Sequence, residues 1–415
     1  MGGARESPRD SGETRHAKDE GYQAQTKTGG PRIQEGQYRR GLQDVERGEK
    51  GTRRTARPEQ ACRGEARRAG GRLTRPCARG DGDICAALRR PERSARRGCA
   101  VSENGRVAEH FADRLISAVL ARGAPCAVAL DPVYSSLPAE LTSRVGKTAP
   151  VAAELSAILE FSRRVLRVIV SHVPVVKINS AYFERYHADG VSALDELIAE
   201  ARRLGLLVLA DVKRGDVGHT AEMYADACLG WAKGGEVFQT ADAVTISGYF
   251  GRDGAAPFIE SAKRSGKGVF VLVRTSNPSA AHIQDVQALD GRKVHEIVAA
   301  QVAQWADADD AIGKCGYSLV GAVVATRNAA DARRLREIMP RSIFLVPGYG
   351  AQGGRPEDFQ PYFCRSGGGA LVVAGRSVIF AHSAPAYRDE SGNSWEECVE
   401  RACRDFVADI CRVAV

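Results

Sequence analysis

The sequence predicts an α/β protein in which eight β/α units close into a (β/α)8 TIM barrel. From residue 101 onward, short apolar runs rich in β-branched residues alternate with amphipathic segments. Runs that are apolar throughout are typical of parallel strands buried on both faces. Eight such units between residues 101 and 415 fit this barrel in size and strand count. A doubly wound open sheet is the alternative, but no GxGxxG motif follows the first strand.

Strands and helices are expected to alternate along the whole of this region. The expected strands are 127–131, 175–178, 206–211, 243–246, 269–273, 320–324, 343–346 and 371–373. Amphipathic helical patterns cover 153–171, 191–204, 220–232, 255–264, 295–308 and 329–339, with a shorter one near 356–364 and a last one over 395–413. In a barrel of this kind the active site forms at the carboxyl ends of the strands.

Residues 1–100 differ from the rest of the chain in composition. They hold 24 Lys and Arg against 14 Asp and Glu, no Phe or Trp, and seven residues from Leu, Ile, Val and Met. So little apolar surface cannot offset the entropy of ordering the chain, and we expect a disordered basic extension before a domain spanning 101–415. The extension is also consistent with sequence upstream of the true start, since Val101 begins the globular composition and a valine codon can start translation in bacteria.

Two functional interpretations of this extension are weaker. Arginine pairs such as Arg53-Arg54 could contact nucleic acid, but no aromatic residues are interleaved to stack on bases. A mitochondrial transit peptide would be poor in acidic residues, and this stretch is not.

The sequence shows no membrane span and no signal peptide. Its eleven scattered cysteines fit a reducing cytoplasm rather than a disulfide framework.

The most informative segment is Asp211-Val-Lys-Arg-Gly-Asp216, which leaves directly from the apolar run 206–210. Period-two alternation places Asp211 and Lys213 on one face of the strand. A salt bridge at the end of a strand would explain one acid–base pair, but less easily a third charge at fixed spacing. Because an unpaired buried charge costs several kcal/mol or more, this array indicates a functional site.

Further polar residues lie near the ends of other expected strands or in the segments after them, so they should gather at the same rim. They are Asp131, Lys177, Ser276, the loop 348–354 and the pair Gly375-Arg376. The glycine-rich loop Pro347–Gly354 and the Gly375-Arg376 turn follow the last two strands, where such barrels commonly bind phosphate. Arg376 offers a planar fork for two phosphate oxygens, and Gln352 can donate an amide N–H.

With these residues placed, the chain resembles the orotidine 5′-phosphate decarboxylase family, specifically its longer bacterial subgroup, from about residue 127 to 380. The resemblance is carried in order by Val-Ala-Leu-Asp131-Pro, Val-Lys177, Ala-Asp211-Val-Lys213-Arg-Gly-Asp216-Val-Gly-His-Thr220, Val-Arg-Thr-Ser276-Asn-Pro, Val-Pro347-Gly-Tyr-Gly-Ala-Gln352-Gly-Gly and Ala-Gly375-Arg376-Ser. Ile178-Asn179 stands where many relatives have Pro-Gln, and Ser247-Gly248-Tyr249 where the subgroup usually has Asn-Pro-Tyr.

The resemblance implies decarboxylation of orotidine 5′-phosphate to UMP, the last step of de novo pyrimidine synthesis, without metal or organic cofactor. By the same resemblance Lys213 protonates carbon 6 of the substrate. The implied catalytic set is Lys177, Asp211, Lys213 and Asp216. Asp216 would come from the other subunit of a homodimer, with Thr220 crossing beside it if residues 216–220 are helical.

The implied substrate contacts divide the site by chemistry. Asp131 and Lys177 would hold the ribose hydroxyls, and Ser276 would contact the pyrimidine ring. Phosphate binding falls to Gln352 and Arg376, within loops that also contribute Pro347 and Gly375.

Two rival functions remain at this point. The first is a keto-sugar-phosphate decarboxylase of the same barrel superfamily, which binds Mg²⁺ and would need a carboxylate where this chain has Lys177. The second is a nucleic-acid-binding protein acting through residues 1–100. The net charge of −2 on residues 101–415 and the charged rim favour an enzyme without a nucleic-acid partner.

Overall fold

The computed structural model describes residues 109–143, 150–230, 232–233, 236–237, 240–326, 328–365, 367–388 and 392–414. The interpretations of residues 1–100, and the domain boundary drawn after them, therefore lie outside the described residues. In the described part of the chain, no helix has both the length and the apolar character needed to cross a membrane.

Eight parallel strands form a closed barrel, as the sequence predicts. They are β1 (Cys126–Leu130), β2 (Val175–Asn179), β3 (Leu207–Arg214), β6 (Ala243–Ser247), β7 (Gly268–Arg274), β8 (Val320–Val324), β9 (Phe344–Pro347) and β10 (Ala370–Ala374). Each pairs with the next in that order, and β10 returns to pair with β1. Two further strands, β4 (Ala232–Lys233) and β5 (Glu236–Val237), form a separate antiparallel pair.

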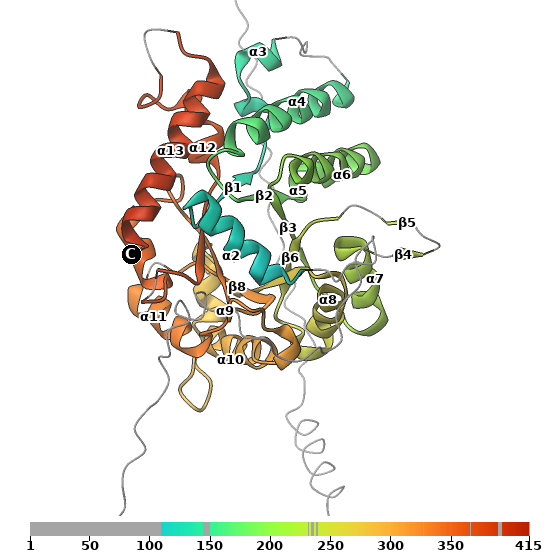
Figure 1. The fold of residues 1–415 in the computed structure, drawn as a ribbon, viewed down its shortest axis with the longest axis vertical. Coiled ribbons are helices and arrows are strands. Elements are labelled where there is room, and N and C mark those ends of the chain that lie inside the picture. The colour runs from blue at the N-terminus through green and yellow to red at the C-terminus, as the bar shows by residue number, and fades with distance from the viewer. Residues whose placement is uncertain are drawn as a thin grey trace, which may run out of the picture. The chain divides into compact units, whose positions relative to one another are not determined.

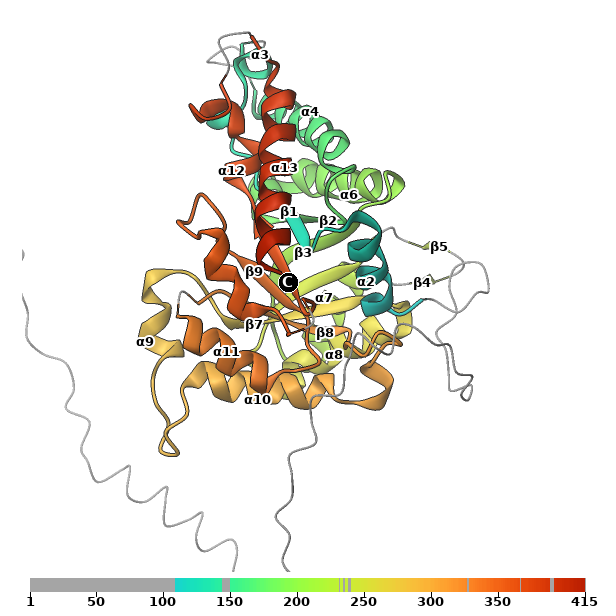
Figure 2. The same cartoon turned by 60° about the vertical axis from the view of Figure 1, so that its left-hand side comes forward.

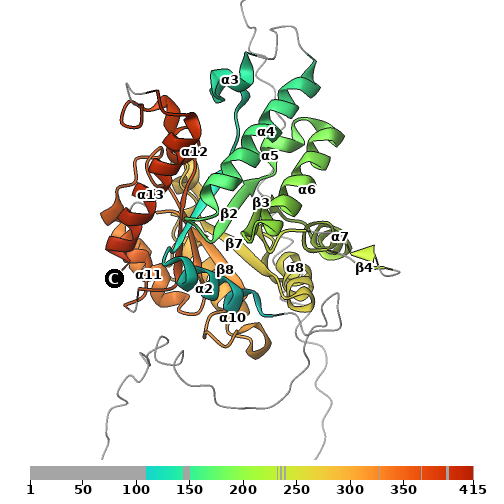
Figure 3. The same ribbon diagram turned by 45° about the horizontal axis from the view of Figure 1, so that its top comes forward.

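Helices surround this barrel. The longer ones are α4 (Val151–Ile169), α6 (His187–Arg203), α7 (Gly218–Leu229), α8 (Gly251–Ser265), α10 (Val294–Ala306), α11 (Ala329–Ile338) and α13 (Trp395–Val413). The short helices α3 (Ala139–Thr142), α5 (Ala181–Glu184), α9 (Ala281–Gln284) and α12 (Arg376–Ile379) lie in the connections. Figure 3 shows α4 and α6 side by side, where they are in contact.

Three expected helix boundaries were wrong by three or four residues, and one expected helix is of another type. α6 begins at His187 and α8 at Gly251, each four residues before its expected start. α7 ends at Leu229 because Gly230 adopts a φ of 96°, which a right-handed helix cannot continue. The pattern near 356–364 forms the 3₁₀ helix η5 (Pro356–Tyr362) rather than an α-helix, since Pro361 within it lacks the N–H that a helix interior needs.

A helix absent from the sequence prediction, α2 (Phe111–Arg122), lies against the end of the barrel where the strands begin (Figure 1). Its Phe111 ring packs edge-on against Phe270 of β7, with ring centroids 6.0 Å apart. A Cβ on Gly268 would lie 2.3 Å from the Phe111 ring, and one on Gly321 would lie 2.5 Å from the Phe270 ring. These two glycines leave the space that the aromatic rings fill, and α2 closes this end of the barrel.

The C-terminal helix α13 packs against α4 and η5 (Figure 2). Trp395, at its first turn, stacks on Phe161 of α4 with ring centroids 5.1 Å apart. Ser394 caps the helix by accepting a hydrogen bond from the backbone N–H of Glu397. The end of the chain is thereby fixed against the barrel wall.

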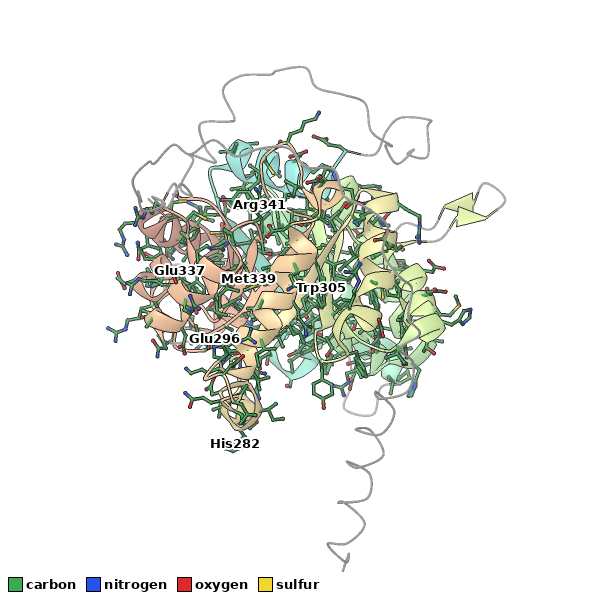
Figure 4. The ribbon with its side chains drawn as sticks, turned by 90° about the horizontal axis from the view of Figure 1, so that it is seen from below. His282, Glu296, Trp305, Glu337, Met339 and Arg341 are labelled. Atoms are coloured by element: carbon green, nitrogen blue, oxygen red, sulfur yellow. The ribbon has the colours of Figure 1, made fainter. Side chains whose placement is uncertain are left out.

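Figure 4 shows the outer surface near α10 and α11, with Glu296 and Trp305 on α10 and His282 on α9 at the edge of the view. Two ion pairs join α10 and its N-cap to α11: Lys293 Nζ lies 3.1 Å from Asp331 Oδ1, and Arg334 Nε lies 3.3 Å from Glu296 Oε1. Ion pairs that solvent still reaches, like these two half-buried pairs, contribute about 1 kcal/mol or less. This surface is an ordinary solvated helix layer.

Candidate active site

A cavity of about 240 Å³ opens at the carboxyl ends of the barrel strands. It is lined from seven of the eight strands or the loops that follow them. Nine of the eleven site residues expected from sequence line it: Asp131, Lys177, Asp211, Lys213, Ser276, Pro347, Gln352, Gly375 and Arg376.

One side of the cavity is a chain of alternating charges carried by β1, β2 and β3. Lys177 Nζ lies 3.3 Å from Asp131 Oδ1 and 2.9 Å from Asp211 Oδ2. Lys213 Nζ lies 2.7 Å from the other oxygen, Asp211 Oδ1. The strand register creates this order, because Ala129 of β1 pairs with Lys177 and Asn179 of β2 pairs with Asp211. Three of the expected charges, Lys177, Asp211 and Lys213, therefore lie together in the folded chain, whereas Asp216 does not lie with them.

Burial makes this cluster electrostatically strong. The Lys177 side chain is only 8% exposed and that of Asp211 only 11%. Burial alone would raise the pKa of Asp211, but the ammonium groups of Lys177 and Lys213 outweigh it and lower this pKa to about 2. Burial likewise opposes the charge on Lys177, whereas Asp131 and Asp211 raise its pKa above the usual value. Asp211 is therefore an anion and Lys177 a cation at neutral pH.

Lys213 has a backbone conformation that alternation alone did not predict. Its φ is 46°, in the left-handed region, and the pairing of β3 with β6 shifts register between Ala210 and Arg214. A non-glycine residue in this region costs about 1–3 kcal/mol, and such strain concentrates at functional sites. The bulge carries β3 through Arg214 while leaving the Lys213 side chain 48% exposed at the cavity. Of the cluster, Lys213 is the member most accessible to a bound molecule.

The side of the cavity formed by β7 carries Thr275 and Ser276. Gln284 of α9 accepts a hydrogen bond from the Thr275 N–H at 2.9 Å and donates to its hydroxyl at 2.9 Å. Arg274 donates to Gln284 Oε1 at 3.3 Å and pairs with Asp285 at 3.0 Å. The segment that presents Ser276 is thus held by side chains from the connection after β7.

A third side of the cavity is the glycine-rich loop after β9 together with the start of α12, which follows β10 and therefore lies next to β1. Gly348, Gly350 and Gly353 have φ values of 137°, 66° and 83°, which other residues rarely adopt. Backbone hydrogen bonds from Gly350 N–H to Gly354 and from Gly354 N–H to Gly348 close the loop on itself. Arg376, the first residue of α12, is exposed and lines the cavity. An anion between Arg376 and Gln352 would meet donors from both.

Asp216 and Thr220 are not among the described residues that line this cavity. Asp216 precedes α7, and its carboxylate accepts a hydrogen bond from the Val217 N–H at 2.8 Å. The condition for the expected relation, a helix over residues 216–220, is not met, because α7 begins only at Gly218, whose φ is 52°. Within one chain, neither residue joins the charged cluster.

Sequence reasoning missed three polar residues at or beside this site. Asn179 and Thr275 line the cavity. Thr245 of β6 is fully buried and donates its hydroxyl to Asp211 Oδ1 at 2.9 Å. A signal for Thr245 was present, since it is the only polar residue in the apolar run 243–246.

The chain is similar in sequence to characterised protein families. The sequence profile of the orotidine 5′-phosphate decarboxylase / HUMPS family matches residues 150–388. An orotidine 5′-phosphate decarboxylase from Rhodopirellula baltica is 38% identical over 299 residues, which cover 70% of this chain and 96% of that protein. One from Caldicellulosiruptor bescii is 36% identical over 292 residues, covering 69% and 94%.

The fold is similar as well. The solved structure of Leishmania donovani OMP decarboxylase superposes with a TM-score of 0.56 and 26% sequence identity. The match covers 74% of this chain and 99% of that one. Sequence and fold similarity therefore both extend over nearly the full length of the relatives.

Proposed function

Because this chain belongs to the orotidine 5′-phosphate decarboxylase / HUMPS family, we propose that it converts orotidine 5′-phosphate to UMP without a cofactor, as the last step of de novo UMP synthesis. The observation that carries the proposal is the buried charge chain through Lys177, Asp211 and Lys213, which shares one cavity with Gln352 and Arg376. The charged cluster is suited to the reacting carbon, and the loop after β9 together with Arg376 is suited to a phosphate.

The chemistry requires a cation beside the reacting carbon. When the bond between carbon 6 and the carboxylate breaks, CO₂ leaves and the electron pair remains on carbon 6, in the plane of the ring. No neighbouring carbonyl delocalises that pair, so each tenfold in rate requires 1.36 kcal/mol of stabilisation from the protein. In our proposal the Lys213 ammonium stabilises the carbanion, donates a proton to carbon 6, and is reprotonated from solvent.

Asp211 has two roles in this scheme. It holds the Lys213 ammonium at 2.7 Å, and its negative charge lies beside the position proposed for the substrate carboxylate. A carboxylate placed there is disfavoured in the ground state and relieved when CO₂ departs. The ammonium groups of Lys177 and Lys213 lower the pKa of Asp211 and so favour this negative charge.

The remaining cavity residues fit the rest of the substrate. We assign Asp131 and Lys177 to the ribose hydroxyls and Ser276 to the pyrimidine ring. Gln352 and Arg376 receive the phosphate, with Pro347 and Gly375 shaping the backbone around it. Binding energy from the distant phosphate then supports the chemical step at carbon 6.

We further propose that the enzyme is a homodimer in which Asp216 and Thr220 complete the partner's site. Exposed apolar side chains surround them on α7 and at the start of α8: Val217 (52% exposed), Met223 (50%), Tyr224 (38%), Tyr249 (85%) and Phe250 (44%). Exposed apolar side chains gathered on two helices that are in contact indicate an interaction site. A second copy bound there by two-fold symmetry would bring Asp216 towards the other cavity.

The position of Lys177 argues against a Mg²⁺-dependent sugar-phosphate decarboxylase. The Lys177 ammonium lies between Asp131 and Asp211, where a metal-dependent decarboxylase would place a cation held by carboxylates. The rival function of nucleic-acid binding depends on residues 1–100, which lie outside the described residues.

The seven described cysteines, all free, fit an enzyme of the reducing cytoplasm.

The test is loss of orotidine 5′-phosphate absorbance with purified protein, with and without EDTA. We expect decarboxylation at the same rate in both, with stoichiometric UMP and CO₂. The matched control is Lys213→Ala at the same concentration, which excludes a contaminating decarboxylase. A requirement for Mg²⁺, restored by titration after EDTA, would move the assignment to the sugar-phosphate rival. Absence of turnover by folded wild-type protein would refute the proposal.

A further inference from the structure

Thr245 joins the two central residues of the charged cluster from a neighbouring strand. It is the third residue of β6, is fully buried, and is not among the described residues that line the cavity. Its hydroxyl donates to Asp211 Oδ1 at 2.9 Å and accepts a hydrogen bond from the Lys213 N–H at 3.0 Å. One hydroxyl therefore connects the Asp211 carboxylate to the Lys213 backbone.

The strand geometry explains why a side chain makes this contact. The register shift between Ala210 and Arg214 interrupts the regular pairing of β3 with β6 at Lys213. A bulged residue leaves the ladder, so its backbone N–H needs another acceptor. The Thr245 hydroxyl is that acceptor, and it supports Lys213 at a φ of 46°, which an unsupported lysine would leave.

The second bond of Thr245 sets the direction of the carboxylate. Asp211 Oδ2 faces Lys177 at 2.9 Å, whereas Oδ1 accepts from both Lys213 Nζ at 2.7 Å and Thr245 at 2.9 Å. Because a threonine hydroxyl has one hydrogen to donate, the bond to Asp211 leaves its lone pairs for the Lys213 N–H. Thr245 thus holds the Lys213 backbone directly and the Lys213 ammonium through Asp211 Oδ1.

We propose that Thr245 is a positioning residue that fixes the Lys213 ammonium for proton delivery to carbon 6. This inference rests on the proposed decarboxylase function and deepens it. Thr245 acts through Lys213 and Asp211 and does not touch the substrate. Its removal should slow the chemical step while leaving substrate and product binding nearly unchanged.

The test compares Thr245→Val, which keeps the shape and removes the hydroxyl, with Thr245→Ser, which keeps the hydroxyl. Loss of a hydrogen bond to a charged group predicts a fall in kcat of about 10- to 100-fold for Thr245→Val. We expect Thr245→Ser to stay within about threefold of wild type. Ile246→Val, which trims the next buried side chain of β6, is the packing control and should retain kcat.

Two readouts separate positioning from a general structural role. KM and the affinity for UMP should change little in Thr245→Val, whereas the exchange of the UMP carbon-6 proton with D₂O should slow in parallel with kcat. A wild-type kcat in Thr245→Val would overturn the proposal. So would equal losses of kcat and UMP affinity, or a Thr245→Ser variant as slow as Thr245→Val. If Thr245→Val does not fold, Thr245→Ala, which also removes the hydroxyl, takes its place under the same criteria.

Failure of the decarboxylase assignment would be visible separately, because wild-type protein would then not turn over orotidine 5′-phosphate. In that case the rate at which the Lys213 amine reacts with an acylating reagent at one fixed pH, measured by mass spectrometry, still reports the contact. Thr245→Val should change that rate, and Thr245→Ser should not. An unchanged rate in Thr245→Val would contradict the positioning role.

Discussion

At one side of the cavity, Lys177 and Asp211 lie on buried strands and are already paired, whereas at the other side Arg376 is exposed on a short helix beside a glycine-rich loop. The charged side has its geometry before any substrate binds, because the strand register and Thr245 set it. The phosphate side consists of loop backbone with several glycines. We therefore expect the first side to perform the chemical step and the second to bind the phosphate, whose binding energy supports that step.

Replacing Lys213 should lower kcat more than any other substitution that we propose. A small fall in kcat would contradict the contrast between the two sides of the cavity. Loss of the proton donor and its charge predicts that Lys213→Ala lowers kcat by about four orders of magnitude. UMP affinity should change by less than about tenfold, since the phosphate contacts remain. Lys263→Ala, which removes a lysine paired with Glu260 and Asp310 on the outer surface, is the control and should keep full activity. A similar loss in both variants would show that the Lys213 result is not specific to the site.

Arg376→Ala should show the opposite pattern. Loss of a charge-assisted contact to phosphate predicts a fall in kcat/KM of about 10²- to 10³-fold, with a strong rise in KM. Orotidine, which lacks the phosphate, should be turned over equally well by wild type and variant. Steady-state kinetics with both substrates make the comparison. Equal losses on the two substrates would mean that Arg376 does not bind phosphate.

A smaller effect is expected where the phosphate loop is anchored. The Tyr349 hydroxyl donates to Asp409 of α13 at 2.7 Å, and its ring lies 4.6 Å from that of Phe406. Burial and then Asp409 raise the pKa of Tyr349, so the hydroxyl remains a donor at neutral pH. Tyr349→Phe should raise KM by about three- to tenfold with kcat nearly unchanged. In an Asp409→Asn background, Tyr349→Phe should raise KM little further. Additive increases in KM would contradict the proposed anchoring of the loop by this hydrogen bond.

The buried charges also predict a pH dependence of stability. The pKa of Asp211 is about 2 in the folded chain, below the value near 3.9 of an unfolded aspartate. Its contribution is therefore complete above about pH 4 and is lost as the pH falls towards 2, amounting to about 2 kcal/mol. Denaturant unfolding of wild type and Asp211→Asn should give a stability difference that shrinks by this amount between pH 5 and pH 2. A difference independent of pH would show that Asp211 is not held by the two lysines.

The same contrast explains how much the sequence could predict. Eight apolar runs identified the strands, and residues that directly follow them, such as Asp131 and Ser276, were correctly expected at the cavity. The backbone of Lys213 was not predictable, because a β-bulge depends on pairing with β6, which is distant in sequence. Thr245 was missed for the same reason, since its role appears only when β6 lies beside β3. The motif predicted that Asp216 and Thr220 belong to a site shared between subunits, and neither is among the described residues that line the cavity of one chain.

The most direct test of the account is complementation between Lys213→Ala and Asp216→Ala. Each variant should be nearly inactive alone, because every site of its homodimer lacks a required group. A heterodimer would contain one site with both defects and one with neither, so co-refolding should restore about half the activity of a wild-type dimer per heterodimer. Native mass spectrometry measures the heterodimer fraction, and the double mutant refolded with itself is the control. Activity rising in proportion to heterodimer is the result we predict; no recovery in a mixture that contains heterodimers would place both residues in one subunit's site and contradict the shared active site.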